Sequence, residues 1–235
     1  MGIMVCCGCT HFRRLLLVGA ALVGAALAQQ QSPLELNGGS CLVMAGRKCL
    51  AVAVDKRFGK GNELVSDNAR RVLKLHSRLL CAFTGLTTDV QTLMQDLAAA
   101  AASYTITEGR PLQPAAAAAL LSSMLYARRR SPYFCETIVA GLTRSAEAFV
   151  RSHDVLGAAG GAEDGFAVMG TSAESLYGLC EAFYRPDMTP EELADTAEHC
   201  LVAALERDCL SGHGVVVHLL TEQGISSREL GPQRQ

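Results

Sequence analysis

The stretch that decides the fold is NGGSCLVMAGRKCLAVAVDKRFG, residues 37–59. Two short apolar runs, SCLVMAG and CLAVAVD, lie on either side of the basic pair Arg47-Lys48. Apolar runs of this length that contain β-branched residues predict strands, and the turn between them predicts that the strands pair. We therefore expect an antiparallel hairpin, opened by Gly38 and Gly39.

Outward from this hairpin, strand and helix patterns come in blocks. The order is strands, two helices, strands, two helices, strands. Thr87, Thr88 and Asp89 offer capping oxygens to the first helix, and Thr189 begins a capping box ahead of the last one. Strands are expected at residues 71–77, 78–85, 134–142, 146–154, 166–170, 214–221 and 225–230, a polar loop at 58–63, and helices at 90–104, 114–127, 172–185 and 189–209.

Helices that arrive in pairs between blocks of strands do not suit a parallel βαβ sheet. They suit antiparallel sheets with helix pairs packed outside, which is an α+β fold. The body is expected to be one domain, residues 37–235. About half of the chain is hydrophobic, with no tryptophan, so its core must be mainly aliphatic.

The net charge of −2 and isoelectric point near 6.3 give no reason to expect a nucleic-acid partner. Ten cysteines are present, but seven of them are scattered singly through the body, most within apolar runs. An odd number cannot all pair internally, and buried free cysteine behaves as a small hydrophobe. We therefore expect reduced core cysteines, as in a cytosolic protein.

No metal or other cofactor is expected. The one cluster of potential ligands has no recognised metal-binding spacing. It comprises His199, Cys200, Cys209, His213 and His218.

The N-terminal sequence, unlike the cysteine pattern, predicts a secreted protein. Arg13 and Arg14 precede the apolar run LLLVGAALVGAALA, which ends in Ala-Leu-Ala before three glutamines. This is the pattern of a secretory signal and is short for a membrane span. Taken alone it predicts export, which conflicts with the cysteine pattern.

Five fragments in a fixed order decide between these interpretations. They are NGG at 37–39, AVAVDKRFG at 51–59, AFTGLTTDVQTL at 82–93, GTSAE at 170–174 and ERDCLSGHGVVVH at 206–218. With the order of strands and helices, they closely resemble proteasome β-type subunits, in particular the β3 type. The resemblance implies a four-layer αββα sandwich, the fold of the N-terminal-nucleophile hydrolases.

The resemblance also implies roles for individual residues. In active members a threonine freed by autolysis attacks the peptide carbonyl, and its own amine serves as the base. Several supporting positions match that pattern, including Gly85, whose counterpart provides the oxyanion-binding turn. The others are Asp55, Arg57, Asp208 and Ser211, with Thr171 in place of a further serine.

Two positions depart from the pattern. The nucleophile lies sixteen positions before the first aspartate, which here is Gly39, a residue with no side chain. The family's lysine, sixteen positions after that aspartate, is Arg71, which stays charged and cannot shuttle a proton. The pocket is therefore expected to be degenerate, with no catalytic residue.

Ser40 offers an alternative nucleophile after cleavage at Gly39. It lies one residue out of register, however, and in a strand such a shift turns the side chain to the opposite face, away from Asp55 and Arg71. An active peptidase that uses Ser40 remains the second hypothesis. A secreted binding module that has borrowed this fold is the third.

On the first hypothesis the chain is a non-catalytic structural subunit of the 20S proteasome core, a threonine-type endopeptidase complex. Its partners would be the other α and β subunits, in a heptameric β ring stacked as α7β7β7α7, together with protein substrates of the complex, and no membrane. Residues 1–36 would then be an atypical extension or a gene-model insertion outside the fold. The expected location is the cytoplasm and nucleus.

Overall fold

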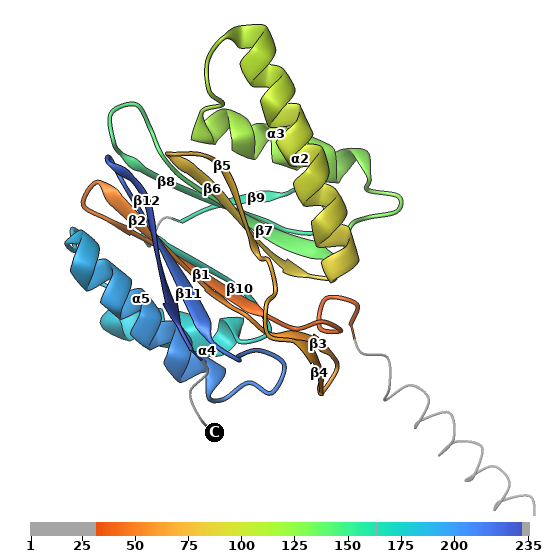
Figure 1. Cartoon of the computed structure of the whole chain (residues 1–235), viewed down its shortest axis with the longest axis vertical. Helices are drawn as coiled ribbons and strands as arrows, with labels where there is room; N and C mark the ends of the chain where they lie inside the picture. Colours follow the sequence, from red (N-terminus) through yellow and green to blue (C-terminus); the bar gives the residue numbers. More distant parts are fainter. Residues whose placement is uncertain (1–31, 163, 232–235) are drawn as a thin grey trace, which may run out of the picture. The chain divides into compact units, whose positions relative to one another are not determined.

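The predicted hairpin forms the middle of a five-stranded antiparallel sheet in the computed structural model, which describes residues 32–162 and 164–231. β1 (Ser40–Gly46) pairs with β2 (Cys49–Asp55), and the strand order is β10-β1-β2-β11-β12 (Figure 1). The other strands are β10 (Phe166–Gly170), β11 (Val215–Thr221) and β12 (Gly224–Leu230). Every residue of β2 is buried, so this hairpin lies in the interior.

A second antiparallel sheet has the order β5-β6-β7-β8-β9. Its strands are β5 (Val72–His76), β6 (Leu79–Gly85), β7 (Cys135–Leu142), β8 (Ala148–His153) and β9 (Ala159–Gly161). A separate two-stranded hairpin, β3 (Phe58–Lys60) with β4 (Glu63–Ser66), projects from the chain after β2.

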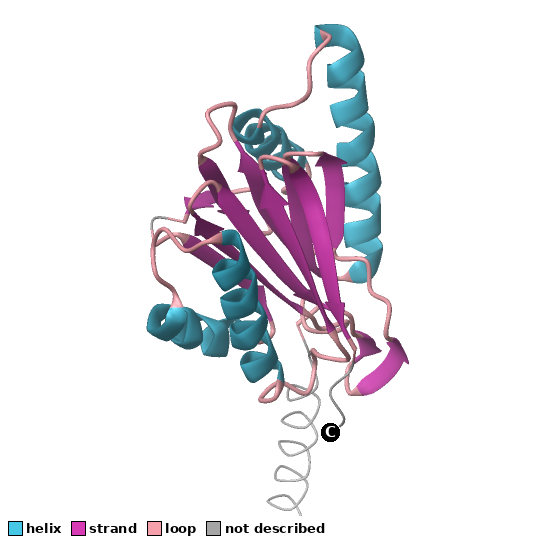
Figure 2. Cartoon of the chain, turned by 60° about the vertical axis from the view of Figure 1, so that its left-hand side comes forward, coloured by secondary structure: helices cyan, strands magenta, loops and turns pink. Residues whose placement is uncertain are grey.

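Two helix pairs cover the outer faces of the sheets (Figure 2). α2 (Thr87–Glu108) and α3 (Pro114–Ala127) pack on the second sheet. α4 (Ala173–Phe183) and α5 (Pro190–Leu205) pack on the first. The predicted four-layer αββα sandwich is therefore confirmed.

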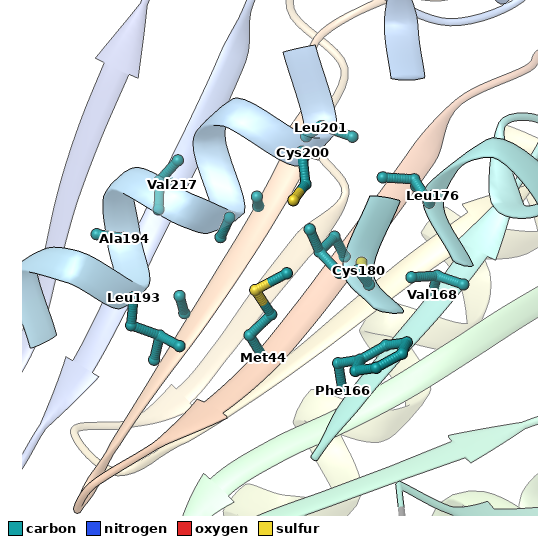
Figure 3. Packing of buried hydrophobic residues seen from close by; sticks show 14 of the residues in the cluster. Met44, Phe166, Val168, Leu176, Cys180, Leu193, Ala194, Cys200, Leu201 and Val217 are labelled. Atoms are coloured by element: carbon teal, nitrogen blue, oxygen red, sulfur yellow. The ribbon is translucent and has the colours of Figure 1, made fainter. Parts of the chain in front are cut away.

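Three apolar clusters fill the spaces between the layers. β1 contributes to two of them: Leu42 and Met44 belong to the cluster with α4 and α5, whereas Cys41 and Val43 belong to the cluster with the second sheet. Figure 3 shows Met44 in the first of these clusters, with Cys180 of α4 and Cys200 of α5. This alternation follows from the two-residue period of a strand. It also fixes the register at Gly39 and Ser40, where the chain enters β1.

Three details of the sequence-based prediction were wrong. The last helix ends at Leu205, not near Cys209, because residues 206–214 form the loop that leads into β11. The segment 58–63 contributes to the β3–β4 hairpin and is not simply a loop. The first helix begins at Thr87 itself, with Leu86 at the cap position and no side-chain capping hydrogen bond.

The signal-like run at residues 15–28 lies outside the described part of the chain. Among the helices at residues 32–162 and 164–231, none combines the length and apolarity needed to cross a bilayer. The predicted domain start at residue 37 remains a prediction, although Leu36 contacts the body, since its carbonyl accepts the Gly61 N–H at 2.8 Å.

Candidate functional site

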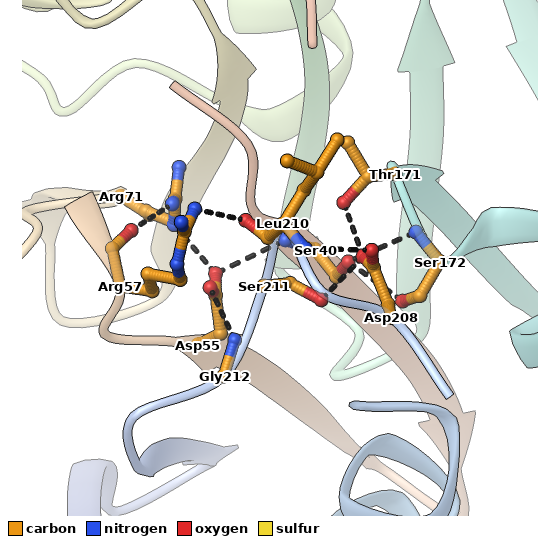
Figure 4. Close-up of polar contacts among 10 residues, drawn as sticks. All are labelled: Ser40, Asp55, Arg57, Arg71, Thr171, Ser172, Asp208, Leu210, Ser211 and Gly212. Atoms are coloured by element: carbon orange, nitrogen blue, oxygen red, sulfur yellow. Dashed lines mark hydrogen bonds and ion pairs between the residues drawn. The ribbon is translucent and has the colours of Figure 1, made fainter. Parts of the chain in front are cut away.

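The site predicted from the sequence lies where chain segments leave the ends of several strands (Figure 4). Gly39 immediately precedes β1, Asp55 ends β2, Arg71 precedes β5 and Thr171 follows β10. The loop between α5 and β11 adds Asp208 and Ser211. Hydrogen bonds and ion pairs join these residues into two neighbouring groups, one around Asp55 and one around Asp208.

Arg71 occupies the space that a side chain at position 39 would need. A Cβ atom added to Gly39 would lie 2.0 Å from Arg71 Cζ and 2.1 and 2.3 Å from its two terminal nitrogens. Gly39 also has a φ of 115°, a conformation that side-chain-bearing residues avoid. The guanidinium and a side chain at position 39 are thus mutually exclusive in this arrangement.

Asp55 holds this first group together. Its carboxylate is fully buried, lies 2.6 Å from Arg71 Nε, and accepts the N–H groups of Ser40 at 3.0 Å and Gly212 at 3.1 Å. Burial raises the pKa of the Asp55 carboxyl, whereas the Arg71 guanidinium and the two N–H donors act in the opposite direction. The pairing matters because a charge left alone at this depth would be strongly destabilising.

Arg57 is also buried, but its role is to join loops. It donates to the Leu210 carbonyl at 2.8 Å and to the Gly61 carbonyl at 2.7 Å, and its own carbonyl accepts from Arg71 Nη2 at 2.5 Å. A guanidinium can satisfy several backbone carbonyls at once because its donors form a rigid planar fork. The β3–β4 hairpin and the loop before β11 are thereby fixed to the pocket.

The second group is centred on Asp208. One of its carboxylate oxygens accepts hydrogen bonds from the hydroxyls of both Thr171 and Ser211, and the other accepts the Leu210 N–H at 2.9 Å. These are charge-assisted hydrogen bonds, which are stronger than neutral ones. They join Thr171, which follows β10, to the loop before β11 through one carboxylate.

Ser40 points away from the first group. Its backbone N–H donates to Asp55, but its hydroxyl accepts from the Ser172 hydroxyl at 2.6 Å and from the Ser172 N–H at 3.2 Å. The side chain therefore faces α4, as the register argument predicted. The Ser172 hydroxyl is the donor in this contact, and it is not a base that could accept a proton from the Ser40 hydroxyl.

Gly85 lies at the end of β6 with a φ of 105°. A Cβ there would meet the Phe134 carbonyl at 2.5 Å and Cys135 Cα at 2.9 Å, so only glycine fits this turn. Its surroundings are thus mainly backbone: Cys135 lies opposite it in the sheet, and the next residue, Leu86, donates its N–H to the Phe134 carbonyl at 2.8 Å.

Sequence reasoning missed four residues that build the site. Ser172, Leu210 and Gly212 act through backbone groups or a local hydroxyl; they lie within the fragments at 170–174 and 206–218, but their residue types do not indicate these roles. Asn37 is the fourth: its amide donates to the Gly59 carbonyl at 2.9 Å and its oxygen accepts the Thr87 N–H at 2.9 Å. Its place at the start of NGG, two residues before Gly39, was the available signal.

Comparison with known proteins places these observations in a family. The proteasome subunit family model matches residues 35–220. The chain is 41% identical over 196 residues to proteasome subunit beta type-3 of Picea mariana, covering 83% of this chain and 96% of the relative. It is 43% identical over 187 residues to proteasome subunit beta type-3 of Oryza sativa subsp. japonica, covering 80% of this chain and 91% of the relative.

A more distant relative gives the same result. Proteasome subunit beta type-3 of Dictyostelium discoideum is 38% identical over 204 residues, which cover 86% of this chain and 99% of that protein. Together with the αββα sandwich, these similarities show that the chain belongs to the proteasome subunit family.

Proposed function

We propose that this chain is a non-catalytic, structural β subunit of the 20S proteasome core particle. In this role it completes a heptameric β ring, contacts its neighbours in the α7β7β7α7 stack, and supports protein degradation by active subunits. Its relatives carry the name proteasome subunit beta type-3, and it spans nearly their whole length.

The observation that carries the non-catalytic role is the position of Arg71. Its guanidinium fills the volume that a nucleophile at position 39 would need, and it forms an ion pair with the buried Asp55. An arginine in this place cannot accept or deliver a proton at physiological pH. The pocket is thus built as a packed structural element.

Exposed apolar side chains support the subunit role. Large exposed apolar groups on a folded chain commonly mark contacts with other proteins. On this chain the most exposed of these groups are Ile106 at 83%, Tyr126 at 60% and Val65 at 59%. The others are Leu64, Phe134, Leu156, Tyr177 and Phe183.

The test is a purification of the native chain under an affinity tag. A structural subunit co-migrates with a large complex that contains other α and β subunits, and it is not labelled by an electrophilic peptide that modifies the active subunits of that complex. Covalent labelling of this chain, or a mature chain that begins at Ser40, would support the active-peptidase alternative. Recovery of the chain by itself in the culture medium would support a secreted module.

The proposal extends to residues 1–36 and to location. We place the residues that precede the family match at residue 35 outside the proteasome domain, as an extension or gene-model insertion, and we place the protein in the cytoplasm and nucleus. Expression of the full chain fused to a reporter tests both statements. Efficient secretion of the reporter would contradict the proposed location, and peptide sequencing of the native N-terminus decides whether the segment is present.

A further inference from the structure

Three loops at one end of the second sheet enclose a surface cleft of about 330 Å³. They are the β5–β6 turn, the α2–α3 loop and the turn between β7 and β8. The side chains that give the cleft its chemistry are His76, Ser77, Arg78, Gln113, Thr143 and Arg144. None of them belongs to the pocket around Asp55 and Asp208.

The cleft is positively charged and has no internal counterion. Arg78 and Arg144 both line it, and no Asp or Glu does. Within residues 32–162 and 164–231, neither arginine takes part in a salt bridge. A second cleft on the molecule differs in this respect, since its Lys48 is paired with Glu222.

Hydrogen bonds within the chain hold the floor of the cleft in place. The Arg78 N–H donates to His76 Nδ1 at 3.2 Å, which leaves His76 Nε2 to donate to the Leu112 carbonyl at 2.8 Å. The Arg78 carbonyl accepts the Leu142 N–H at 3.0 Å. The three loops are thus linked before any ligand binds, and both nitrogens of the imidazole are used within the fold.

The rim is fixed in a similar way. Thr143 N–H donates to the Glu147 carbonyl at 2.9 Å, and the Glu147 N–H donates to the Thr143 hydroxyl at 3.1 Å. This turn presents the exposed Arg144. Across the cleft, Gln113 precedes α3, whose N-terminus has no side-chain cap and carries the positive end of the helix dipole.

We propose that this cleft binds a carboxylate side chain of a neighbouring subunit in the assembled complex, an inference that rests on the proposed function. Two guanidiniums match a planar carboxylate because each can form paired hydrogen bonds to its oxygens. The Ser77 hydroxyl and the Gln113 amide add neutral donors. A partner protein is favoured over a free anion because the open cleft leaves a small ion screened by water, whereas a covering subunit excludes water and strengthens the pairing.

The test uses the full chain, tagged and expressed in cells beside the untagged wild-type chain, so that the two compete for places in the complex. Arg78→Gln and Arg144→Glu are the test variants, and Arg130→Glu is the control, since it makes the same charge change on an exposed turn outside the cleft. We expect Arg144→Glu to lower the incorporated fraction by about tenfold, Arg78→Gln by less, and Arg130→Glu to leave it unchanged. Thermal unfolding of each purified chain checks that the variants fold.

A second measurement identifies the carboxylate. Arg144→Lys keeps the charge and supplies an amine that a carbodiimide can couple to an adjacent carboxylate with formation of an amide. In the purified complex we expect a cross-linked peptide that joins residue 144 to an Asp or Glu of another subunit, and none from the control Arg130→Lys.

Each outcome separates this inference from the proposed function. If the wild-type chain enters the complex but Arg144→Glu competes equally and no cross-link forms, the inference is wrong and the subunit role stands. If inorganic phosphate raises the melting temperature of the wild-type chain but not of Arg144→Glu, while incorporation is unaffected, the cleft is a small-anion site and the inference is again wrong. If the wild-type chain enters no complex, both fall.

Discussion

At the scale of single residues, Gly39 and Arg71 form one packing solution. Because Gly39 has no side chain, there is space beside the buried Asp55. The guanidinium at the end of the long Arg71 side chain fills this space and forms an ion pair with the Asp55 carboxylate. A lysine would leave part of the space empty and offer no planar fork to the surrounding carbonyls. The glycine at position 39 and the arginine at position 71 are therefore physically coupled.

This coupling predicts the effect of restoring the missing side chain. Gly39→Thr should lower the free energy of unfolding by roughly 2–4 kcal/mol, because its Cβ would overlap the Arg71 guanidinium and the residue would keep a strained backbone conformation. Chemical denaturation measures the loss. The variant should also stay unlabelled by an electrophilic peptide, since Arg71 blocks the productive position.

Gly109→Ala is the matched control for backbone strain. Gly109 also has a positive φ, of 62°, but a Cβ there would meet nothing within 4 Å. Its substitution should therefore cost only about 1 kcal/mol. If Gly39→Thr were no more destabilising than Gly109→Ala, Arg71 would not occupy the space as described.

At the scale of elements, the ends of α2 and α5 are stabilised in different ways. The Thr189 hydroxyl and the Glu192 carboxylate cap α5 reciprocally, as the sequence predicted. The first turn of α2 instead receives its side-chain acceptor from Asn37, fifty residues earlier in the chain. Local sequence patterns find the first kind of cap and cannot find the second, because it exists only after β1 and α2 have met.

A pair of threonine substitutions tests this difference. Thr189→Ala should destabilise the protein by about 1 kcal/mol, the usual loss for a helix N-cap. Thr88→Ala, at an exposed position in the first turn of α2, should change stability by less than about 0.5 kcal/mol. Equal effects in denaturant titrations would show that the cap on α5 contributes nothing of its own.

His153 links α3 to β8 and gives the fold a pH dependence. It is buried, and its Nε2 lies 3.1 Å from the Ala118 carbonyl, to which it donates. Burial lowers the pKa of His153 below its ordinary value of 6.5; the hydrogen bond to the Ala118 carbonyl opposes this shift, and Arg151 and Asp154 act in opposite directions to each other. The folded state therefore binds fewer protons than the unfolded state as the pH falls below 6.5, so stability is lost on acidification.

Replacement of that imidazole should flatten the pH profile. In His153→Gln the urea midpoint should fall less between pH 7.5 and pH 5.5 than in the wild type, even if the variant is less stable throughout. His199→Gln, at an exposed position, serves as the control and should retain the wild-type slope. An unchanged slope in His153→Gln would assign the pH dependence to other groups.

At the scale of the whole molecule, the layered architecture could be predicted because it depends on periodicity. The continuous apolar runs of β1 and β2 predicted strands, and the helical patterns that arrive in pairs predicted helices packed outside the sheets. Geometry within the site could be predicted only in part. The register predicts that the Ser40 side chain points away from Asp55, but the occupation of the Gly39 volume by Arg71 depends on the path of a long side chain. The β3–β4 hairpin was missed because its first half and its turn, residues 58–63, are mostly glycine and polar residues, which indicate a loop.

The last prediction concerns the cysteines, because their reactivity reports how well the three apolar clusters exclude solvent and reagents. Of the seven cysteines in the described part of the chain, six are buried free thiols and one, Cys209, is exposed. Burial raises the pKa of Cys49 to about 11 and those of Cys81 and Cys135 to about 12, which removes the reactive thiolate as well as access to it.

Brief treatment of the native protein with a maleimide should therefore modify Cys209 and spare the other six, whereas treatment in denaturant should modify all seven. Peptide mass spectrometry reads each site separately. Cys209→Ser is the control, and it should remove native labelling within residues 32–231. Rapid native labelling of Cys180 or Cys200 would mean that α4 and α5 open from the first sheet far more readily than their packing indicates.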